Sequence, residues 1–402
     1  MIFMDTKQML EKAIRFFLFI FILFIPMKTS IYPISFGILV LLFGIYIFKN
    51  KQFSTFITII KANKKVIVAF VLVISCMTLS NILSPYSTYD SWRIIFHYIF
   101  RYFLFFLILL FFYKKAVISK HFIILAVFSS LLLQAVDGIF QAIYQYDFIR
   151  HKVGSLYAYG LSGATFNRNT FGLFMAIGAS LAIVFLIKKE YNNFSNYKKG
   201  LLYFSTILFI FGLLFSYSRS AWIFFNVFSI LFFSLEYKSL SYKDFIISLM
   251  CIFFIVFSFY YFDTLYTRLL QLIHLNSSNR DTVWLDSLHL IKERPFFGYG
   301  LMTYAKIASQ KIFSVHNSFL EITLFLGLFG LITFTFLLYV IFQKILQIKN
   351  SIYISFFLSF LTITQFDHSI IKSIPMLSTL SLFAFFIYSE TKGVKELPNE
   401  IS

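Results

Sequence analysis

The chain consists of apolar runs long enough to cross a lipid bilayer, separated by short polar segments rich in lysine. A helix needs about 20 apolar residues to cross the hydrocarbon core. Only 13% of the 402 residues are charged and the mean hydropathy is +0.81, far from the values of a soluble domain. The sequence therefore predicts an all-α, polytopic membrane protein.

We expect about twelve transmembrane helices within a single membrane domain that covers residues 1–402. The apolar stretch 201–235 would be about 52 Å long as one helix, against a core of about 30 Å. Ser218-Arg219-Ser220 interrupts it, which predicts two helices that meet at a turn on the outer face. The predicted spans are 14–27, 31–48, 66–83, 94–113, 121–136, 170–187, 201–217, 221–235, 245–262, 319–342, 351–366 and 375–389.

Loop charge predicts the orientation of these spans. With the N-terminus inside, most of the 35 basic residues fall in the short inner loops and at the chain ends, as the positive-inside rule requires. Both termini are then cytoplasmic. The net charge of +18 reflects this topology among membrane lipids, not nucleic-acid binding. Two long segments, 137–169 and 263–317, lie outside.

The long outer loop 263–317 contains the pattern of a short amphipathic helix. Ser278 or Asn279 suits an N-cap, apolar residues follow at helical spacing, and Pro295 ends the pattern. Such a helix would lie along the membrane surface. Arg280 falls in its first turn, where a guanidinium and free backbone N–H groups suit an anion. The alternative is an exposed arginine paired with Asp281.

Two further residues at the outer face are candidates for chemistry. A charged side chain in the bilayer costs at least ~2.5–3.5 kcal/mol, so Arg219 faces a cavity or partner, or else extends to the interface at a helix end. His316 precedes the predicted span 319–342. A neutral imidazole can accept a proton from an attacking hydroxyl. The alternative is a capping or interfacial histidine.

Other polar residues give weaker signals, and several motifs are absent. His97 and Arg101 lie in a predicted span, and further polar residues lie at outer ends of spans: Asn167, Arg168, Asn169, Asp367 and His368. No Asp-x-Asp pair, Walker-type glycine loop or zinc-ligand spacing occurs. We therefore expect no metal and no cofactor, and any phosphate would be neutralised by arginine.

Several of these residues fall in a pattern that resembles the O-antigen ligase / O-antigen polymerase superfamily. The pattern runs from Arg280 and Trp284 through Arg294-Pro295-Phe296-Phe297-Gly298-Tyr299-Gly300 to His316-Asn317-Ser318-Phe319-Leu320-Glu321 and Gly327-Leu328-Phe329-Gly330. Ser216-Tyr217-Ser218-Arg219-Ser220-Ala221 and Thr165-Phe166-Asn167-Arg168-Asn169 are similar to two upstream motifs of that superfamily. The resemblance covers about residues 165–345.

The resemblance implies a GT-C-like membrane glycosyltransferase with a periplasmic active site. Such an enzyme transfers a glycan from undecaprenyl pyrophosphate to an acceptor, without metal. In the ligase branch the acceptor is the lipid A–core oligosaccharide, and the product is lipopolysaccharide. By motif, Arg219 and Arg280 would hold the diphosphate and His316 would serve the acceptor hydroxyl. Asn317, Asn167 and Asn169 would add contacts to the substrate.

Two other functions stay open at this point. An O-antigen polymerase would use the same donor chemistry on carrier-linked repeat units, and the compact loop 263–317 favours the ligase over it. A transporter or flippase would place charged residues near the bilayer midplane, and often shows internal repeats. The predicted spans contain few charges, and their polar clusters lie at the outer ends, which favours an enzyme.

Overall fold

Every element in the described part of the chain is a helix or a helical turn. The computed structural model describes residues 6–27, 29–151, 160–165, 167–187, 194–239, 242, 260–274, 280–308, 315–366 and 373–390. The elements are α1 (Thr6–Leu23), α2 (Ile31–Lys49), α3 (Phe53–Ala62), α4 (Lys64–Leu83), α5 (Tyr89–His97), η1 (Tyr98–Leu104), α6 (Phe105–Lys114), α7 (Lys120–Tyr144), η2 (Gly163–Thr165), α9 (Arg168–Ile187), α10 (Asn196–Phe215), α11 (Arg219–Glu236), η4 (Tyr237–Ser239), α13 (Asp263–Ile273), α14 (Arg280–Glu293), α15 (Tyr304–Ile307), α16 (Ser318–Ile348), α17 (Ser351–Ile363) and α18 (Ile374–Tyr388).

The prediction of an all-helical, multi-pass membrane protein is confirmed. Eight spans of the described chain are long and apolar enough to cross a membrane, and three shorter apolar helices accompany them. The expected total of about twelve is not established by this count. The predicted span 245–262 and the polar pair Asp367 and His368 lie outside the described residues, apart from positions 260–262. The two helices predicted within 201–235 are present as α10 and α11, and they meet at residues 216–218.

Several elements differ from the sequence-based expectation. Helix α1 begins at Thr6 instead of near 14. Helix α7 continues to Tyr144 instead of ending near 136, so the predicted outer segment 137–169 begins as helix. Polar Asp137 and Gln141 end the apolar run, yet both are buried and bond the following loop, which keeps this end helical. Helix α3 occupies a stretch expected to be a loop. Helix α16 extends to Ile348, six residues past the expected end.

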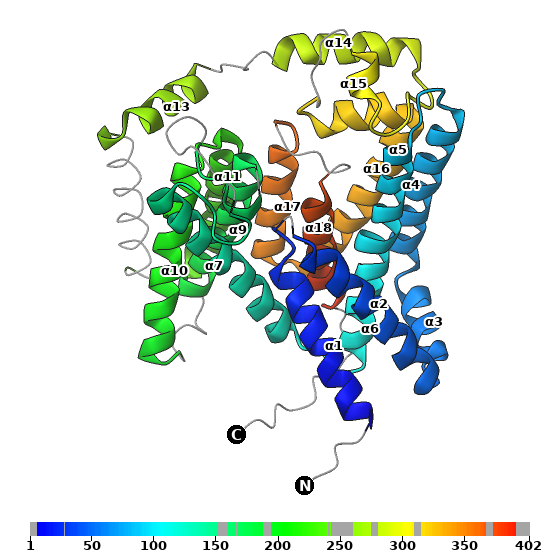
Figure 1. Cartoon of the computed structure of the whole chain (residues 1–402), viewed down its shortest axis with the longest axis horizontal. Coiled ribbons are helices and arrows are strands. Elements are labelled where there is room, and N and C mark those ends of the chain that lie inside the picture. The colour runs from blue at the N-terminus through cyan, green and yellow to red at the C-terminus, as the bar shows by residue number, and fades with distance from the viewer. Residues whose placement is uncertain are drawn as a thin grey trace.

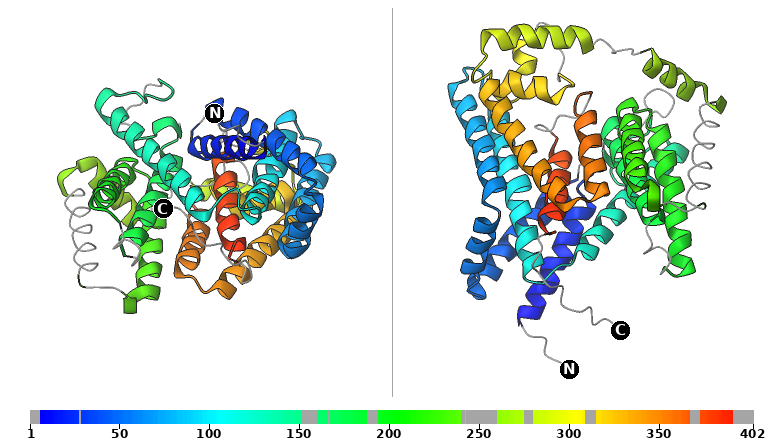
Figure 2. Two further views of the ribbon diagram at one scale, coloured as in Figure 1. Left: turned by 90° about the horizontal axis from the view of Figure 1, so that it is seen from below. Right: turned by 180° about the vertical axis from the view of Figure 1, so that it is seen from behind.

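The helices form two groups with α17 and α18 between them (Figures 1 and 2). One group contains α7, α9, α10 and α11, and the other contains α2 to α6 with α16. Helix α14 crosses one end of the bundle, and α1 starts at the opposite end (Figure 1). Aromatic rings fill much of the interior: the Phe21 ring lies 4.7 Å from Phe105 and 4.9 Å from Tyr32, centroid to centroid. Such pairs add roughly 0.5–1.5 kcal/mol beyond their buried area.

Helix α16 is divided at Gly327, and this break positions the segment around it. A straight helix of 31 residues would be about 46 Å long, too long for a core of about 30 Å. At Gly327 the backbone has φ +69° and ψ −167°, and the turn after α14 packs into the break. Tyr299 N donates to Leu324 O at 3.0 Å, and Leu328 N donates to Pro295 O at 2.7 Å. The segment Pro295–Gly300 and the break at Gly327–Gly330 therefore pack together as one unit.

Candidate functional site

Arg280 is the first residue of α14, and its side chain reaches the end of α17. The guanidinium donates to the backbone carbonyl of Phe366, just beyond that helix. One turn further along α14, Trp284 Nε1 donates to Val315 O at 3.1 Å. These two bonds fix α14 over the segment that enters α16. The capping residues predicted for α14, Ser278 and Asn279, lie outside the described residues.

His316 lies in the junction between this segment and α16. It is half-buried, and its backbone adopts φ +57°, a left-handed conformation in which histidine is enriched among residues other than glycine. The next residue, Asn317, caps α16: its Oδ1 accepts from the N–H groups of Phe319 at 3.0 Å and Leu320 at 3.1 Å. The sharp turn and the cap together set the direction of the His316 side chain.

The end of α17 binds this junction as well as α14. Ser318 N donates to Thr364 O at 2.8 Å, and Asn317 Nδ2 lies 3.5 Å from Gln365 Oε1. With the bond to Phe366, three successive residues after α17 therefore hold Arg280 and the entrance to α16. Neither Gln365 nor Phe366 was predicted as a site residue. Phe366 contributes a backbone carbonyl that any residue type supplies, and Gln365 is a single polar residue at a helix end.

Arg219 begins α11 and lies on the other side of α17. Ser218 caps α11 by accepting from Ala221 N at 3.3 Å, and the half-buried Arg219 donates through Nη1 to Gln271 O of α13 at 3.1 Å. Helices α11 and α17 are antiparallel neighbours, with the Phe224 and Phe356 ring centroids 5.6 Å apart. The start of α11 and the end of α17 therefore lie at the same end of the bundle. The structure joins Arg280 and His316 through α17, and it gives Arg219 a separate partner on α13.

Asn167 and Asn169 belong to the start of α9, and the described contacts give Asn167 a capping role. Its Oδ1 accepts from Asn169 N at 2.8 Å and Thr170 N at 3.1 Å. Helix α9 packs on α11, because Gly172 leaves room for Ser216 and Ser218 at the turn before Arg219. These asparagines are thus close to the α10–α11 turn that precedes Arg219.

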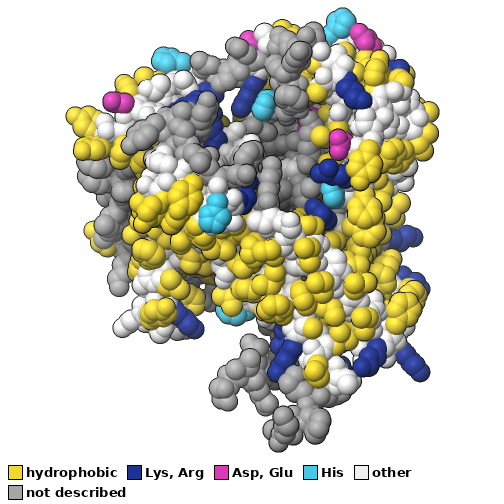
Figure 3. Space-filling view, in the orientation of Figure 1, with side chains coloured by type: hydrophobic (Ala, Val, Ile, Leu, Met, Phe, Trp, Pro, Cys, Tyr) yellow, Lys and Arg dark blue, Asp and Glu magenta, His cyan; other side chains and the backbone are white. Residues whose placement is uncertain are grey.

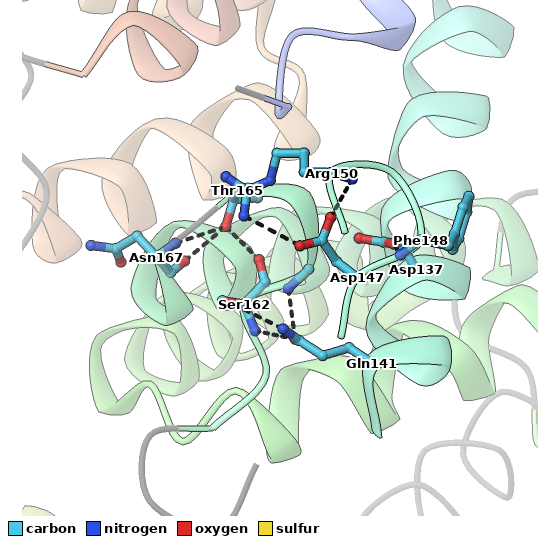
Figure 4. A network of polar contacts seen from close by, with 9 residues as sticks. Asp137, Gln141, Asp147, Phe148, Arg150, Ser162, Thr165 and Asn167 are labelled. Atoms are coloured by element: carbon cyan, nitrogen blue, oxygen red, sulfur yellow. Dashed lines mark hydrogen bonds and ion pairs between the residues drawn. The ribbon is translucent and has the colours of Figure 1, made fainter. Parts of the chain in front are cut away.

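A buried polar network holds the loop that leads to Asn167 (Figure 4). Gln141 Oε1 accepts from Ser162 N at 2.9 Å, and Asp137 Oδ1 accepts from Phe148 N at 2.9 Å. Thr165 Oγ1 donates to Asn167 O at 2.9 Å. The same network contains a buried ion pair of Asp147 and Arg150 at 3.4 Å. Sequence reasoning missed this network, because its members are single polar residues at a helix end with partners spread along a loop.

The end of the molecule that carries α14 is hollowed, and Lys, Arg and His side chains border the hollow (Figure 3). Apolar side chains form a band across the middle of the same face. A separate apolar cavity of about 380 Å³ lies between α1, α7, α9, α17 and α18, and it is lined by none of the predicted site residues. Within the described ranges, no group of three or more His, Cys, Asp or Glu side chains is placed to hold a metal ion.

Comparison with known proteins identifies a family that part of the chain resembles. The sequence profile described as O-Antigen ligase matches residues 204–335, about a third of the chain. This region of the chain is therefore similar to the O-antigen ligase family. No curated protein matches the chain. The matched region contains Arg219, Arg280 and His316, whereas Asn167, Asn169 and the end of α17 lie outside it.

The match supports a likeness to glycosyltransferase-like membrane enzymes. The predicted resemblance is thus confirmed. The family match does not separate ligase from polymerase.

Proposed function

We propose that this protein transfers a glycan from undecaprenyl pyrophosphate to the lipid A–core oligosaccharide at the periplasmic face of the inner membrane, without a metal ion. One observation carries the proposal: within the matched domain, Arg280 and the His316 junction are held together by the end of α17, beside the helix that begins at Arg219. The basic short loops favour cytoplasmic termini, and α14 lies at the end of the bundle opposite the start of α1 (Figure 1).

Arginine suits the leaving group of this reaction. The planar guanidinium offers a fixed fork of N–H donors that matches phosphate oxygens, and it stays charged at any physiological pH. Negative charge grows on the diphosphate as the glycosidic C–O bond breaks, so Arg219 and Arg280 stabilise the transition state more than the ground state. Both residues begin helices, where further backbone N–H groups favour an anion.

His316 supplies the proton acceptor in this proposal. The acceptor hydroxyl oxygen attacks the anomeric carbon of the donor glycan, and the bond from that carbon to the diphosphate oxygen breaks. The electron pair of the broken bond leaves with the undecaprenyl diphosphate, and the hydroxyl proton passes to the neutral imidazole. The left-handed turn at His316 and the cap at Asn317 hold the ring at the entrance to α16.

The test is replacement of His316 by Ala in a strain that makes polymeric glycan. Transfer should fall by a factor of about 10² or more, the usual contribution of a general base, while the protein stays in the membrane. His289→Ala is the matched control, because this histidine is exposed on α14 and paired with Glu293. Normal glycan-capped lipopolysaccharide in the His316→Ala strain would reject the catalytic role.

The same strain background separates ligase from polymerase. Deletion of a ligase leaves lipid A–core without glycan, while polymer accumulates on the lipid carrier. Deletion of a polymerase leaves a single repeat unit attached to the core. The second pattern would replace the proposed acceptor and would keep the donor chemistry of the arginines.

A further inference from the structure

A second set of basic side chains lies along one face of α5 and η1. Arg93, His97 and Arg101 follow one another at intervals of four residues. Residues four apart in a helix share a face, so the three side chains form a row. The row enters η1, a π-helix of seven residues, and π-helical turns are rare and often occur at functional sites. None of these residues belongs to the site proposed above.

The groups in this row are poorly neutralised by the described residues. Arg93 pairs with Asp90 at 3.5 Å, and both side chains are more than half exposed. Arg101 lies with its guanidinium carbon 4.9 Å from the centre of the Tyr32 ring, and no described carboxylate lies within 4.0 Å of it. A cation within a membrane span normally faces a cavity or a partner. Contact with an aromatic ring offsets only part of its charge.

His97 adds an unused polar atom to the same row. Its side chain is only 7% exposed, and its Nδ1 has no hydrogen-bond partner among the described residues. The hydroxyl of the neighbouring Tyr98 is buried and likewise unsatisfied. Buried polar atoms are nearly always bonded in folded proteins, so the unsatisfied Nδ1 of His97, on the helix face that carries both arginines, indicates a missing ligand. Beside two guanidinium groups, the ligand that fits is an anion that accepts hydrogen bonds.

The row faces the same end of the molecule as α14. Ser91 Oγ at the start of α5 donates to Leu301 O at 2.6 Å, which places this end under the turn that follows α14. Tyr32, which Arg101 contacts, bonds Ser378 of α18 at 2.5 Å. Helices α17 and α18 therefore separate this row from Arg219 on α11 (Figures 1 and 2). Basic and histidine side chains border the hollow of Figure 3 on both sides.

We propose that Arg93, His97 and Arg101 form a second phosphate site, which binds a phosphate group of a lipid-linked glycan. The inference rests on the proposed function for its substrate class. A transferase that joins two lipid-anchored anionic molecules must hold each of them. The arginines at α11 and α14 serve the donor diphosphate, so this row is placed to hold the phosphate of the acceptor lipid, whichever glycan that lipid carries.

The experiment uses the full-length protein in nanodiscs and measures binding of two probes, undecaprenyl pyrophosphate and diphosphorylated lipid A. Fully dephosphorylated lipid A is the comparison probe. Arg93→Gln combined with Arg101→Gln should weaken binding of diphosphorylated lipid A by at least about tenfold, because charge-assisted hydrogen bonds are lost. Arg15→Gln is the matched control, because the Arg15 side chain is exposed on α1. Binding of dephosphorylated lipid A should not change.

Each outcome decides the assignment. Weaker binding of diphosphorylated lipid A supports an acceptor site, and weaker binding of undecaprenyl pyrophosphate alone supports a phosphate site that serves the donor. Unchanged binding of both probes overturns the proposal. Arg93→Gln alone is the control for misfolding. This side chain is exposed and not needed for packing, so the variant should fold normally and still bind the probe more weakly. If Arg280→Lys leaves binding of undecaprenyl pyrophosphate unchanged while the row variants lose their probe, the proposed donor site fails and this inference stands.

Discussion

Replacement of Gly327 by Ala should strongly destabilise the protein. The backbone at this position has φ +69° and ψ −167°, a region that is essentially restricted to glycine and costs about 1–3 kcal/mol for other residues. An added Cβ would lie 2.1 Å from the carbonyl carbon and oxygen of Phe296. Those atoms belong to a hydrogen-bonded turn, so they cannot move freely, and overpacking adds about 1–3 kcal/mol. The expected loss is therefore roughly 2–6 kcal/mol.

Gly37 offers a matched control within the same chain. It lies exposed in α2, and an added Cβ would have no heavy atom within 4 Å. Ala at an unstrained helical position stabilises by about 0.5–1 kcal/mol relative to Gly. Unfolding in mixed micelles with increasing SDS, followed by far-UV circular dichroism, should separate Gly37→Ala and Gly327→Ala on opposite sides of the wild-type midpoint. A Gly327→Ala midpoint equal to that of the wild type would refute the steric argument.

Three further results are expected. Arg280→Lys should raise the donor KM by about tenfold or more, because lysine lacks the guanidinium fork, and a wild-type KM in steady-state transfer assays would argue against diphosphate recognition. EDTA should leave the rate of the purified enzyme unchanged, and activity that is lost and then restored by Mg²⁺ would contradict neutralisation by arginine alone. Asn317→Ala should cost about 0.5–2 kcal/mol of stability through the lost cap, whereas Asn317→Ser should retain most of it; equal unfolding midpoints for both variants would exclude the capping role.

Hydropathy was sufficient to predict most membrane helices, because a bilayer-spanning helix is specified by its own composition. The turn before Arg219 was predictable for the same reason, since one helix could not fit the whole apolar stretch. The continuation of α7 to Tyr144 was not predictable. It depends on Asp137 and Gln141 being bonded by a loop whose residues are distant in sequence and individually unremarkable.

The candidate site was likewise predictable in part. Motif order placed Arg280 and His316 in one region, and in the structure the segment after α17 binds both the Arg280 side chain and the turn that contains His316. The spacing of His97 and Arg101 was visible in the sequence, but their surroundings depend on Tyr32 and Ser378, which lie far from them along the chain. Contacts made through backbone carbonyls do not depend on residue type, so the sequence does not reveal this part of a site.

The segment that follows α17 has a mechanical consequence for the protein. Because the carbonyls of Thr364 and Phe366 bind the entrance to α16 and the side chain of Arg280 at the start of α14, a displacement of this segment carries Arg280 and the His316 junction with it. The group that would receive the diphosphate and the group that would receive the proton then travel as one unit. Helix α17 also packs on α11, so the same displacement would act on the helix that begins at Arg219.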